Sequence, residues 1–248
     1  YMHPFGPYGV DLQGIPFHHY WLKQRQTAGS DESANCLSQY CIEYKSALAN
    51  KFSHPQAQSR SPLAHMKYAY HFDATLYAEF LRQLAVGKGV LHIQDNISDV
   101  SKHNNGDIAG VHLEQYPEVK GDLFIDCSGF KGLLINQHLG IKYEDWRKYL
   151  PCDSAIAQPS ESLDHIKPYT IATAHDNGWQ WQIPLQHRIG NGYVYSSEFL
   201  DKASAEDQLA AKLPSKAIAE PRALTWINGK RKQVWERNCI AIGLSAGF

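Results

Sequence analysis

The stretch GDLFIDCSGF, residues 121–130, is the segment that decides the expected fold. Its apolar run over residues 123–125 is continuous rather than alternating, which is typical of a strand buried on both faces. The run ends at Ser128 and Gly129, where the chain can turn tightly. Such a strand needs helices over its sheet, so we predict an α/β protein with an α+β mixture.

The segments before this strand predict a helix and a hairpin. In YHFDATLYAEFLRQLAVGKG, residues 70–89, apolar side chains recur at spacings of three and four, and Asp73 is placed to cap the helix. Residues 90–115 contain two alternating runs joined by the turn-forming HNNGD. They predict a strand over VLHIQD, a hairpin and a return strand.

The segments after it predict a second, sheet-rich part. WQWQIPL at residues 179–185 and GYVYSS at 192–197 read as two strands that the intervening GNG separates. A short helix is predicted at 203–213, a strand near 222–228 and a last strand in NCIAIG. The first strand places two of the six tryptophans on one face, since side chains alternate along a strand.

Composition limits the class of partner. The 24 Lys and Arg residues balance 25 Asp and Glu residues, and the formal net charge of −1 favours a small-molecule partner over nucleic acid. No apolar run approaches the roughly 20 residues that span a bilayer, and the opening lacks a signal-peptide pattern, so we expect a cytoplasmic protein away from membranes. The five cysteines are scattered, never spaced as CxxC, and are expected to be free thiols.

Two short motifs match catalytic patterns, and the surrounding sequence argues against both. Residues 243–247 fit G-x-S-x-G after a strand, but in a hydrolase the acid and the histidine follow the serine, and one residue remains. His71 and Asp73, with His175 or His187, have the spacing of a two-histidine, one-carboxylate iron site. Asp73 is already needed as a helix cap, so we expect no metal.

Dinucleotide binding has no support from motifs alone. It requires a strand, a G-x-G-x-x-G turn and a helix, and no such string occurs. Gly190 and Gly192 lie between predicted strands, and Gly87 and Gly89 follow a helix.

Resemblance to a known family adds what spacing does not show. Six blocks, in this order, resemble the flavin-dependent tryptophan halogenases: GIPFHHYWLK, AYHFDATLYAEFLR, DLFIDCSGFKGLLIN, GWQWQIPL, GYVYSS and NCIAIGLSAGF. WQWQIP is similar to the family's W-x-W-x-I-P signature, carried here by Trp179, Trp181, Ile183 and Pro184. The resemblance covers most of the chain.

The resemblance implies part of the FAD-binding fold of flavin monooxygenases, interleaved with an antiparallel substrate-side sheet. It divides the chain into substrate-side loops and short strands at 1–64, part of the FAD-binding region at 65–150, the substrate-side sheet at 151–231 and a return strand at 232–248. The implied activity uses FADH2 from a separate flavin reductase, oxygen, and chloride or bromide to make hypohalous acid. That oxidant then halogenates tryptophan or another indole.

The resemblance also assigns site residues. The tryptophans of the signature would form part of a wall that separates flavin from substrate, because large rigid rings exclude an aromatic substrate. His3 and Phe5 match the substrate pocket. The flavin would meet five residues: Ile97, Ser128, Gly129, Gly243 and Leu244.

The chain also departs from the family pattern. The G-x-G-x-x-G turn and the catalytic lysine would precede residue 1, and the catalytic glutamate and the chloride-binding P-L-E-S-T loop would follow Phe248. We therefore expect an internal piece of a longer protein, with no catalytic residue of its own. An aromatic hydroxylase of the same fold and a non-catalytic fragment stay open as alternatives.

Overall fold

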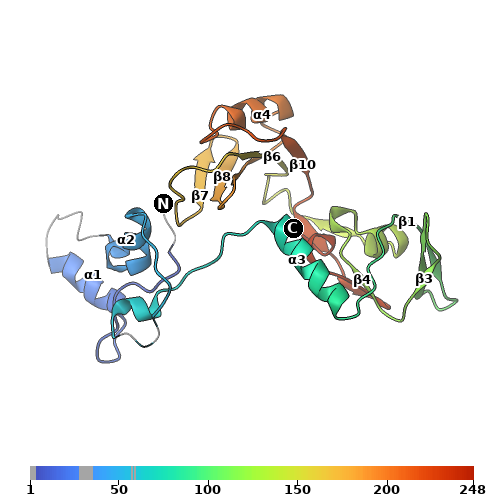
Figure 1. Ribbon diagram of the computed structural model, residues 1–248, viewed down its shortest axis with the longest axis horizontal. Helices are drawn as coiled ribbons and strands as arrows, with labels where there is room; N and C mark the ends of the chain where they lie inside the picture. Colours follow the sequence, from blue (N-terminus) through green and yellow to red (C-terminus); the bar gives the residue numbers. More distant parts are fainter. Residues whose placement is uncertain (1–3, 28–35, 57, 59) are drawn as a thin grey trace. The chain divides into compact units, whose positions relative to one another are not determined.

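The computed structural model describes residues 4–27, 36–56, 58 and 60–248, and these form two compact units. Unit 1 comprises Tyr1–Phe72, Glu161–Ile171 and Gln182–Ile189, and unit 2 comprises Asp73–Ser160, Ala172–Trp181 and Gly190–Phe248. The mixture of helices and sheets confirms the expected fold class (Figure 1). Within the described residues, every helix is too short or too polar for a bilayer crossing.

Unit 1 is helical where we predicted loops and short strands. Its elements are α1 (Phe17–Thr27), η1 (Leu37–Tyr40), α2 (Ile42–Leu48) and η2 (Pro62–His65). Helix α1 buries no residue, so it needs no apolar stripe and gave no periodic signal. In α2 the buried Glu43 carboxylate accepts hydrogen bonds from the Lys67 amide at 2.9 Å and the Cys41 thiol at 3.3 Å. This carboxylate ties α2 to the chain that follows η2.

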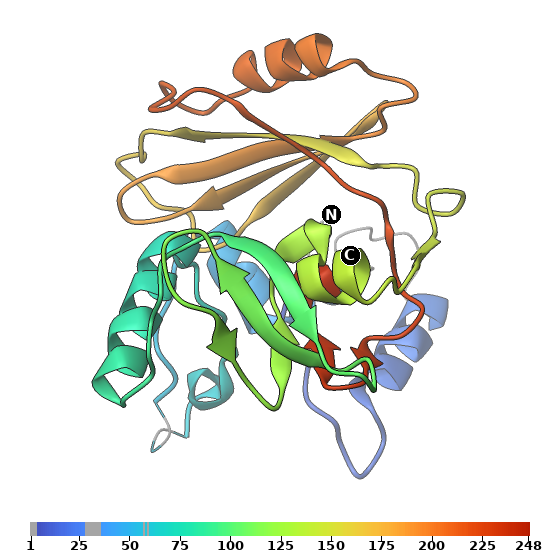
Figure 2. The same ribbon diagram turned by 90° about the vertical axis from the view of Figure 1, so that its right-hand side faces the viewer.

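A five-stranded sheet contains the predicted strands of the second part. Its order is β10-β6-β9-β8-β7, with β6 at Ser154–Ser160, β7 at Ile171–His175, β8 at Gly178–Pro184, β9 at Ile189–Tyr195 and β10 at Arg222–Thr225. Helix α4 (Lys202–Ala210) lies along one face of this sheet (Figure 2). There Ala205 and Leu209 join Ile156, Tyr193 and Tyr195 in a buried cluster. The face under α4 is therefore a hydrophobic core.

The GNG sequence is not the turn that we predicted. Gly190 and Gly192 lie within β9, and the chain reverses earlier, where the Leu185 amide donates to the Arg188 carbonyl at 2.9 Å. A Cβ at Gly192 would stand 1.9 Å from a ring carbon of Trp181. Gly192 is thus required because it leaves room for an indole, a need that a turn-based interpretation does not reveal.

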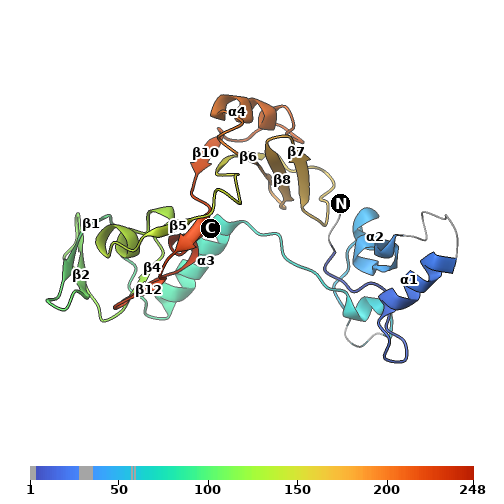
Figure 3. The ribbon, with the colours of Figure 1, turned by 180° about the vertical axis from the view of Figure 1, so that it is seen from behind.

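Besides helix α3 (Ala74–Gly87), the remainder of unit 2 consists of short strands and helical turns (Figure 3). One sheet has the order β1-β2-β3, a second β12-β13-β4, and a ribbon pairs β11 with β5. Their bounds are β1 Ile97–Lys102, β2 Ile108–Leu113, β3 Val119–Lys120, β4 Phe124–Asp126, β5 Tyr143–Asp145, β11 Gly229–Arg231, β12 Trp235–Glu236 and β13 Cys239–Ala241. The turns are η3 Gly129–Lys131, the π-helix η4 Leu133–His138 and η5 Gly243–Ser245. The predicted hairpin and last strand are confirmed.

Two predictions about strands in unit 2 are wrong. Residues 90–96 form no strand, and Leu91 is 81% exposed, because the pairing of β1 with β2 begins only at Ile97. Strand β4 is not buried on both faces, since Leu123 and Ile125 are exposed. It is the edge of its sheet, with β13 as its one neighbour.

Helix α3 (Ala74–Gly87) confirms the predicted helix and its cap. The Asp73 carboxylate accepts the amides of Thr75 at 2.9 Å and Leu76 at 3.4 Å. Its apolar positions, Leu76, Tyr77, Phe80, Leu81 and Leu84, are exposed. The Asp73 cap therefore stabilises the start of this helix, whereas its apolar stripe is not part of a core.

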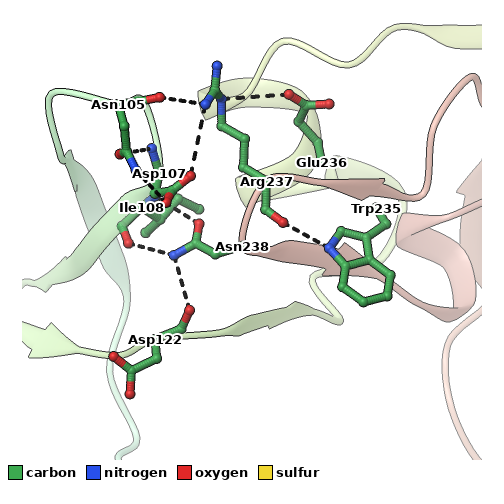
Figure 4. A network of polar contacts seen from close by, with 8 residues as sticks. All are labelled: Asn105, Asp107, Ile108, Asp122, Trp235, Glu236, Arg237 and Asn238. Carbon is green, nitrogen blue, oxygen red and sulfur yellow. Dashed lines mark hydrogen bonds and ion pairs between the residues drawn. The ribbon is translucent and has the colours of Figure 1, made fainter.

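Asn238 lies in the tight connection from β12 to β13. It joins the β12-β13-β4 sheet to the β1–β2 hairpin (Figure 4). Its side chain accepts the Ile108 amide at 2.9 Å and donates to the carbonyls of Ile108 at 2.9 Å and Asp122 at 3.3 Å. The preceding Arg237 has a φ of +53° and bonds the Asn105 carbonyl, while Trp235 donates to the Arg237 carbonyl at 2.8 Å. One amide side chain thus pairs both backbone groups of Ile108, a position of β2 that the pairing with β3 does not reach.

We predict that Asn238→Ala lowers the free energy of unfolding by about 1–3 kcal/mol, because it leaves buried backbone groups of Ile108 without partners. Urea denaturation measures this. Asn104→Ala, at an exposed site in the turn of the same hairpin, is the control and should change stability by less than about 0.5 kcal/mol. Equal effects of the two substitutions would contradict the assigned role.

Candidate functional site

A buried carboxylate at the end of β4 organises the candidate site. Asp126 is 2% exposed and accepts five hydrogen bonds. They come from the Ser128 amide at 2.9 Å and hydroxyl at 2.6 Å, the amides of Leu134 at 2.8 Å and Ile135 at 2.9 Å, and the Ser245 hydroxyl at 3.2 Å. Asp126 therefore holds together a turn after β4 and a turn after β13.

Parallel pairing brings these turns to one edge of the sheet. Strands β4 and β13 run parallel, with Ala241 opposite Asp126. The segments that follow the two strands therefore leave the sheet at the same edge. The Ser245 hydroxyl lies 3.1 Å from the Gly129 carbonyl, which joins the two turns directly. The structure therefore brings together the predicted residues of both turns, although they lie more than a hundred positions apart in the sequence.

The two turns present bare backbone. Gly129 has a φ of +71° and Gly243 a φ of +59°, values that L side chains rarely adopt. A Cβ placed on either glycine would meet no atom within 4 Å. A flat or phosphorylated ligand can approach such backbone closely, whereas any other residue would fill the space.

The electrostatics at Asp126 reflect its surroundings. Burial raises the pKa of this carboxyl, but the hydrogen bonds from Ser128 and from the amides of Ile135 and Leu134 outweigh it. The pKa therefore lies below the usual value of 3.8, and the group is a carboxylate at neutral pH.

A cavity of about 650 Å³ opens beside the turns. It is lined by Phe130, Asn136, Tyr143, Arg147, Asp153, Ser154, Ser197, Thr225, Trp226, Ile227, Arg231 and Leu244. Phe130 and Leu244 directly follow the two glycines, and Phe130 lies nearly parallel to Trp226, with ring centroids 6.4 Å apart. The volume lies within the range of small-molecule sites, and the aromatic walls suit a ring-shaped ligand.

The two signature tryptophans lie elsewhere on unit 2. Trp179 and Trp181 share one face of β8, with ring centroids 6.0 Å apart at 55°, while Gln180 between them points to the other side and is buried. Trp179 is 43% exposed and Trp181 is half-buried. Neither indole is a buried core residue, and neither belongs to the lining of the cavity. Farther along β8, Ile183 is half-buried and Pro184 is buried.

The other predicted site residues are not gathered at the cavity. Ile97 opens β1 instead of following a strand, and it packs against a core that contains Val100 and Ile108. Phe5 is exposed and belongs to unit 1. His3 lies outside the described residues.

The residues of the two disfavoured motifs have structural contacts. Ser245 is fully buried and bonded to Asp126 and Gly129, so its hydroxyl is not an accessible nucleophile. The His71 ring contacts the Pro184 carbonyl through Nδ1 at 2.9 Å, and Asp73 caps α3. The described part of the chain contains no group of three or more side chains that would hold a metal.

Sequence reasoning missed Asp126 and Arg231. Asp126 had a local signal, since an aspartate two residues before a serine at a strand end commonly bonds its own turn. Arg231 had none, because its position in the cavity wall depends on the pairing of β11 with β5.

The fold is that of flavin-dependent halogenases. BrvH, a flavin-dependent halogenase from Brevundimonas sp. BAL3, is 44% identical with a TM-score of 0.92, and the match covers 99% of this chain and 50% of that one. A flavin-dependent halogenase from Xanthomonas campestris is 42% identical with a TM-score of 0.90, over 100% of this chain and 48% of the other.

Comparison with known sequences shows which family the chain belongs to. The model of the family "Tryptophan halogenase" matches residues 1–248, and the chain belongs to this family. Tryptophan 6-halogenase SttH from Streptomyces toxytricini is 35% identical over 100% of this chain and 51% of its own length. The chain spans about half the length of the curated relatives that it matches.

We predict that Asp126→Asn lowers the free energy of unfolding by about 2–3 kcal/mol at neutral pH, because charged hydrogen bonds are lost. The depressed pKa gives the sign with pH: the carboxylate stabilises the fold fully above 3.8, and that stability is lost as pH falls through the folded-state value. Urea titrations from neutral pH to below 3.8 measure this. The variant should lose less stability on acidification than the wild type does, and parallel curves would contradict the role.

Proposed function

We propose that this chain supplies the flavin-facing turns and the partition of a flavin-dependent halogenase acting on tryptophan or another indole. The observation that carries the proposal is the pair of open glycine turns, Gly129 and Gly243, joined through Asp126 beside an aromatic cavity. Membership of the tryptophan halogenase family supports the same conclusion. The alternative of a hydroxylase has no comparable support among the relatives.

The residues present fit FAD. The two turns carry no side chain at the glycines, the Ser128 hydroxyl bonds to Asp126 in the first turn, and Leu244 forms part of the cavity wall. Bound FAD, reduced by a separate flavin reductase, would supply the electrons that activate oxygen, and the activated oxygen would then oxidise chloride or bromide to hypohalous acid. Ile97 belongs to the proposed flavin contacts through its backbone, since its side chain packs in the core.

The residues of this chain would bind the flavin and keep the indole substrate away from it. Trp179 and Trp181 stand on the face of β8 opposite to buried Gln180, where large rings can bar an indole from the flavin. Ile183 and Pro184 complete the signature on the same strand. We assign no proton transfer to any of these residues.

Substrate contact belongs to the proposal as well. Phe5, exposed in unit 1, and His3 are assigned to the indole by resemblance, the ring of Phe5 offering a stacking face. Only a small oxidant, hypohalous acid, would then need to pass from the flavin side to the indole.

We predict that Gly129→Ala weakens FAD binding about tenfold, which is about 1.4 kcal/mol, because the added methyl group fills the space that the flavin would occupy. Quenching of flavin fluorescence measures the dissociation constant. Gly140→Ala is the matched control, because Gly140 has a φ of +73°, close to the +71° of Gly129, and equally open surroundings. Equal weakening by both would mean that backbone strain, not flavin contact, causes the loss.

We further predict that the protein containing this chain brominates an indole when supplied with FADH2, oxygen and bromide, giving the paired isotope masses of bromine in the product. Replacing both Trp179 and Trp181 with alanine should open the partition, so that mass spectrometry detects product carrying oxygen in place of bromine. Trp235→Ala, at an exposed tryptophan of another sheet, is the control. Clean bromination by the double variant would contradict the partition, and oxygen insertion by the wild type would favour the hydroxylase.

A further inference from the structure

The indole of Trp181 lies over a position of the neighbouring strand that has no side chain. The Ser196 amide, just after β9, donates to the Asn177 carbonyl, just before β8, at 3.1 Å. Counting inward from this bond by the same number of residues along each strand places Gly192 opposite Trp181. A Cβ at Gly192 would stand 1.9 Å from Cζ2 and 2.0 Å from Cη2 of that ring. The far edge of the indole therefore occupies the space that any other residue at 192 would fill.

The strands on both sides of this contact are held from the face under α4. Tyr193, next to Gly192, is 2% exposed and packs in the cluster that includes residues of α4. Gln180 is 4% exposed and points to the same face, because side chains alternate along β8. On the other side of Gly192, the Asn191 amide group donates to the Ser160 hydroxyl of β6 at 3.0 Å. The backbone is thus fixed, and the torsions of the tryptophan side chains decide how the rings stand on the opposite face.

Gly178 shows the difference between a glycine that the backbone needs and one that a ring needs. A Cβ at Gly178 would stand 1.9 Å from the Val194 carbonyl oxygen and 2.8 Å from the Tyr195 Cα. Those atoms belong to the sheet and cannot move without breaking strand pairing. At Gly192, by contrast, the three nearest atoms all belong to the Trp181 side chain. A methyl group there would therefore turn the ring away and leave the sheet in place.

We propose that Gly192 is a positioning residue of the partition: its bare backbone seats the indole of Trp181 and thereby sets the angle between the two signature tryptophans. The two rings lie 6.0 Å apart at 55°, and the Trp179 ring is partly exposed, so a shift of one indole changes the packing of the other. The inference rests on the proposed function, because only a partition gives the orientation of the pair a purpose. Gly192 acts through Trp181 and takes no part in the chemistry.

Circular dichroism of the protein that contains this chain tests the orientation. Two indoles this close couple their ultraviolet transitions, and the resulting couplet of bands with opposite sign depends on the angle between the rings. Trp179→Phe should abolish the couplet, which identifies it as the signal of this pair. Gly192→Ala should also remove the wild-type couplet, although both indoles are still present. A wild-type spectrum equal to that of Trp179→Phe would overturn the proposal.

Gly110→Ala is the matched control. Gly110 lies within β2, and a Cβ there would likewise meet the end of a side chain, the Glu118 carboxylate oxygen at 2.7 Å. This variant should leave the couplet unchanged, because the displaced side chain belongs to another sheet. Equal changes in Gly110→Ala and Gly192→Ala would overturn the positioning role.

Urea denaturation gives a second measurement that does not use the couplet. Gly192→Ala should lower the unfolding midpoint, and the loss should be much smaller in a Trp181→Phe background, because the smaller ring does not reach the space that the methyl group fills. If Gly192→Ala alone does not fold, the double variant decides: recovery of a folded protein supports the seat, and failure to recover overturns it. Equal losses in both backgrounds overturn it as well.

Product analysis separates this inference from the proposed function. With FADH2, oxygen and bromide, Gly192→Ala should give product that carries oxygen in place of bromine, whereas Gly110→Ala should give the wild-type product. A changed couplet with clean bromination by Gly192→Ala would count against the partition and leave the positioning role standing. An unchanged couplet in Gly192→Ala would overturn the positioning role, whatever the product.

Discussion

The carboxylate of Asp126 is the interaction on which the candidate site depends. It is buried, and the cost of that burial is offset by hydrogen bonds from the turn after β4, from the start of η4 and from Ser245 after β13. Parallel pairing of β4 and β13 brings these segments to one edge, and the carboxylate then determines how they meet. Without it, the bond from the Ser245 hydroxyl to the Gly129 carbonyl would be the remaining side-chain link between the two glycine turns.

Charge is handled differently at the two buried ionic groups of unit 2. Asp126 has five donors and is satisfied within the protein, so it serves the structure. Arg231 donates to backbone carbonyls, lies over the Tyr143 ring and forms part of the cavity wall. The same contrast holds between glycines: Gly129 is open with a positive φ, whereas Gly192 is extended and pressed against the Trp181 ring. The first is free for a ligand and the second is needed for packing.

The five-stranded sheet separates a structural face from an available one. Helix α4 covers one face, where Tyr193 and Leu209 are buried. The face that carries Trp179 and Trp181 leaves the first indole partly exposed. A strand can supply both faces because its side chains alternate, so a single sequence motif serves the core through Gln180 and an open surface through its tryptophans.

Local chemistry in the sequence was sufficient for elements that depend on near neighbours. The Asp73 cap predicted α3, the turn HNNGD predicted the β1–β2 hairpin, and the ordered motifs indicated the family. Contacts between distant residues were not accessible in this way. Whether a segment forms a paired strand depends on which strands lie beside it in the folded protein. This decides the edge position of β4, the inclusion of GNG in β9 and the lack of a strand over 90–96. Likewise, the cavity with Arg231 exists only because β11 pairs with β5, since burial and charge balance belong to the folded arrangement and not to any local segment.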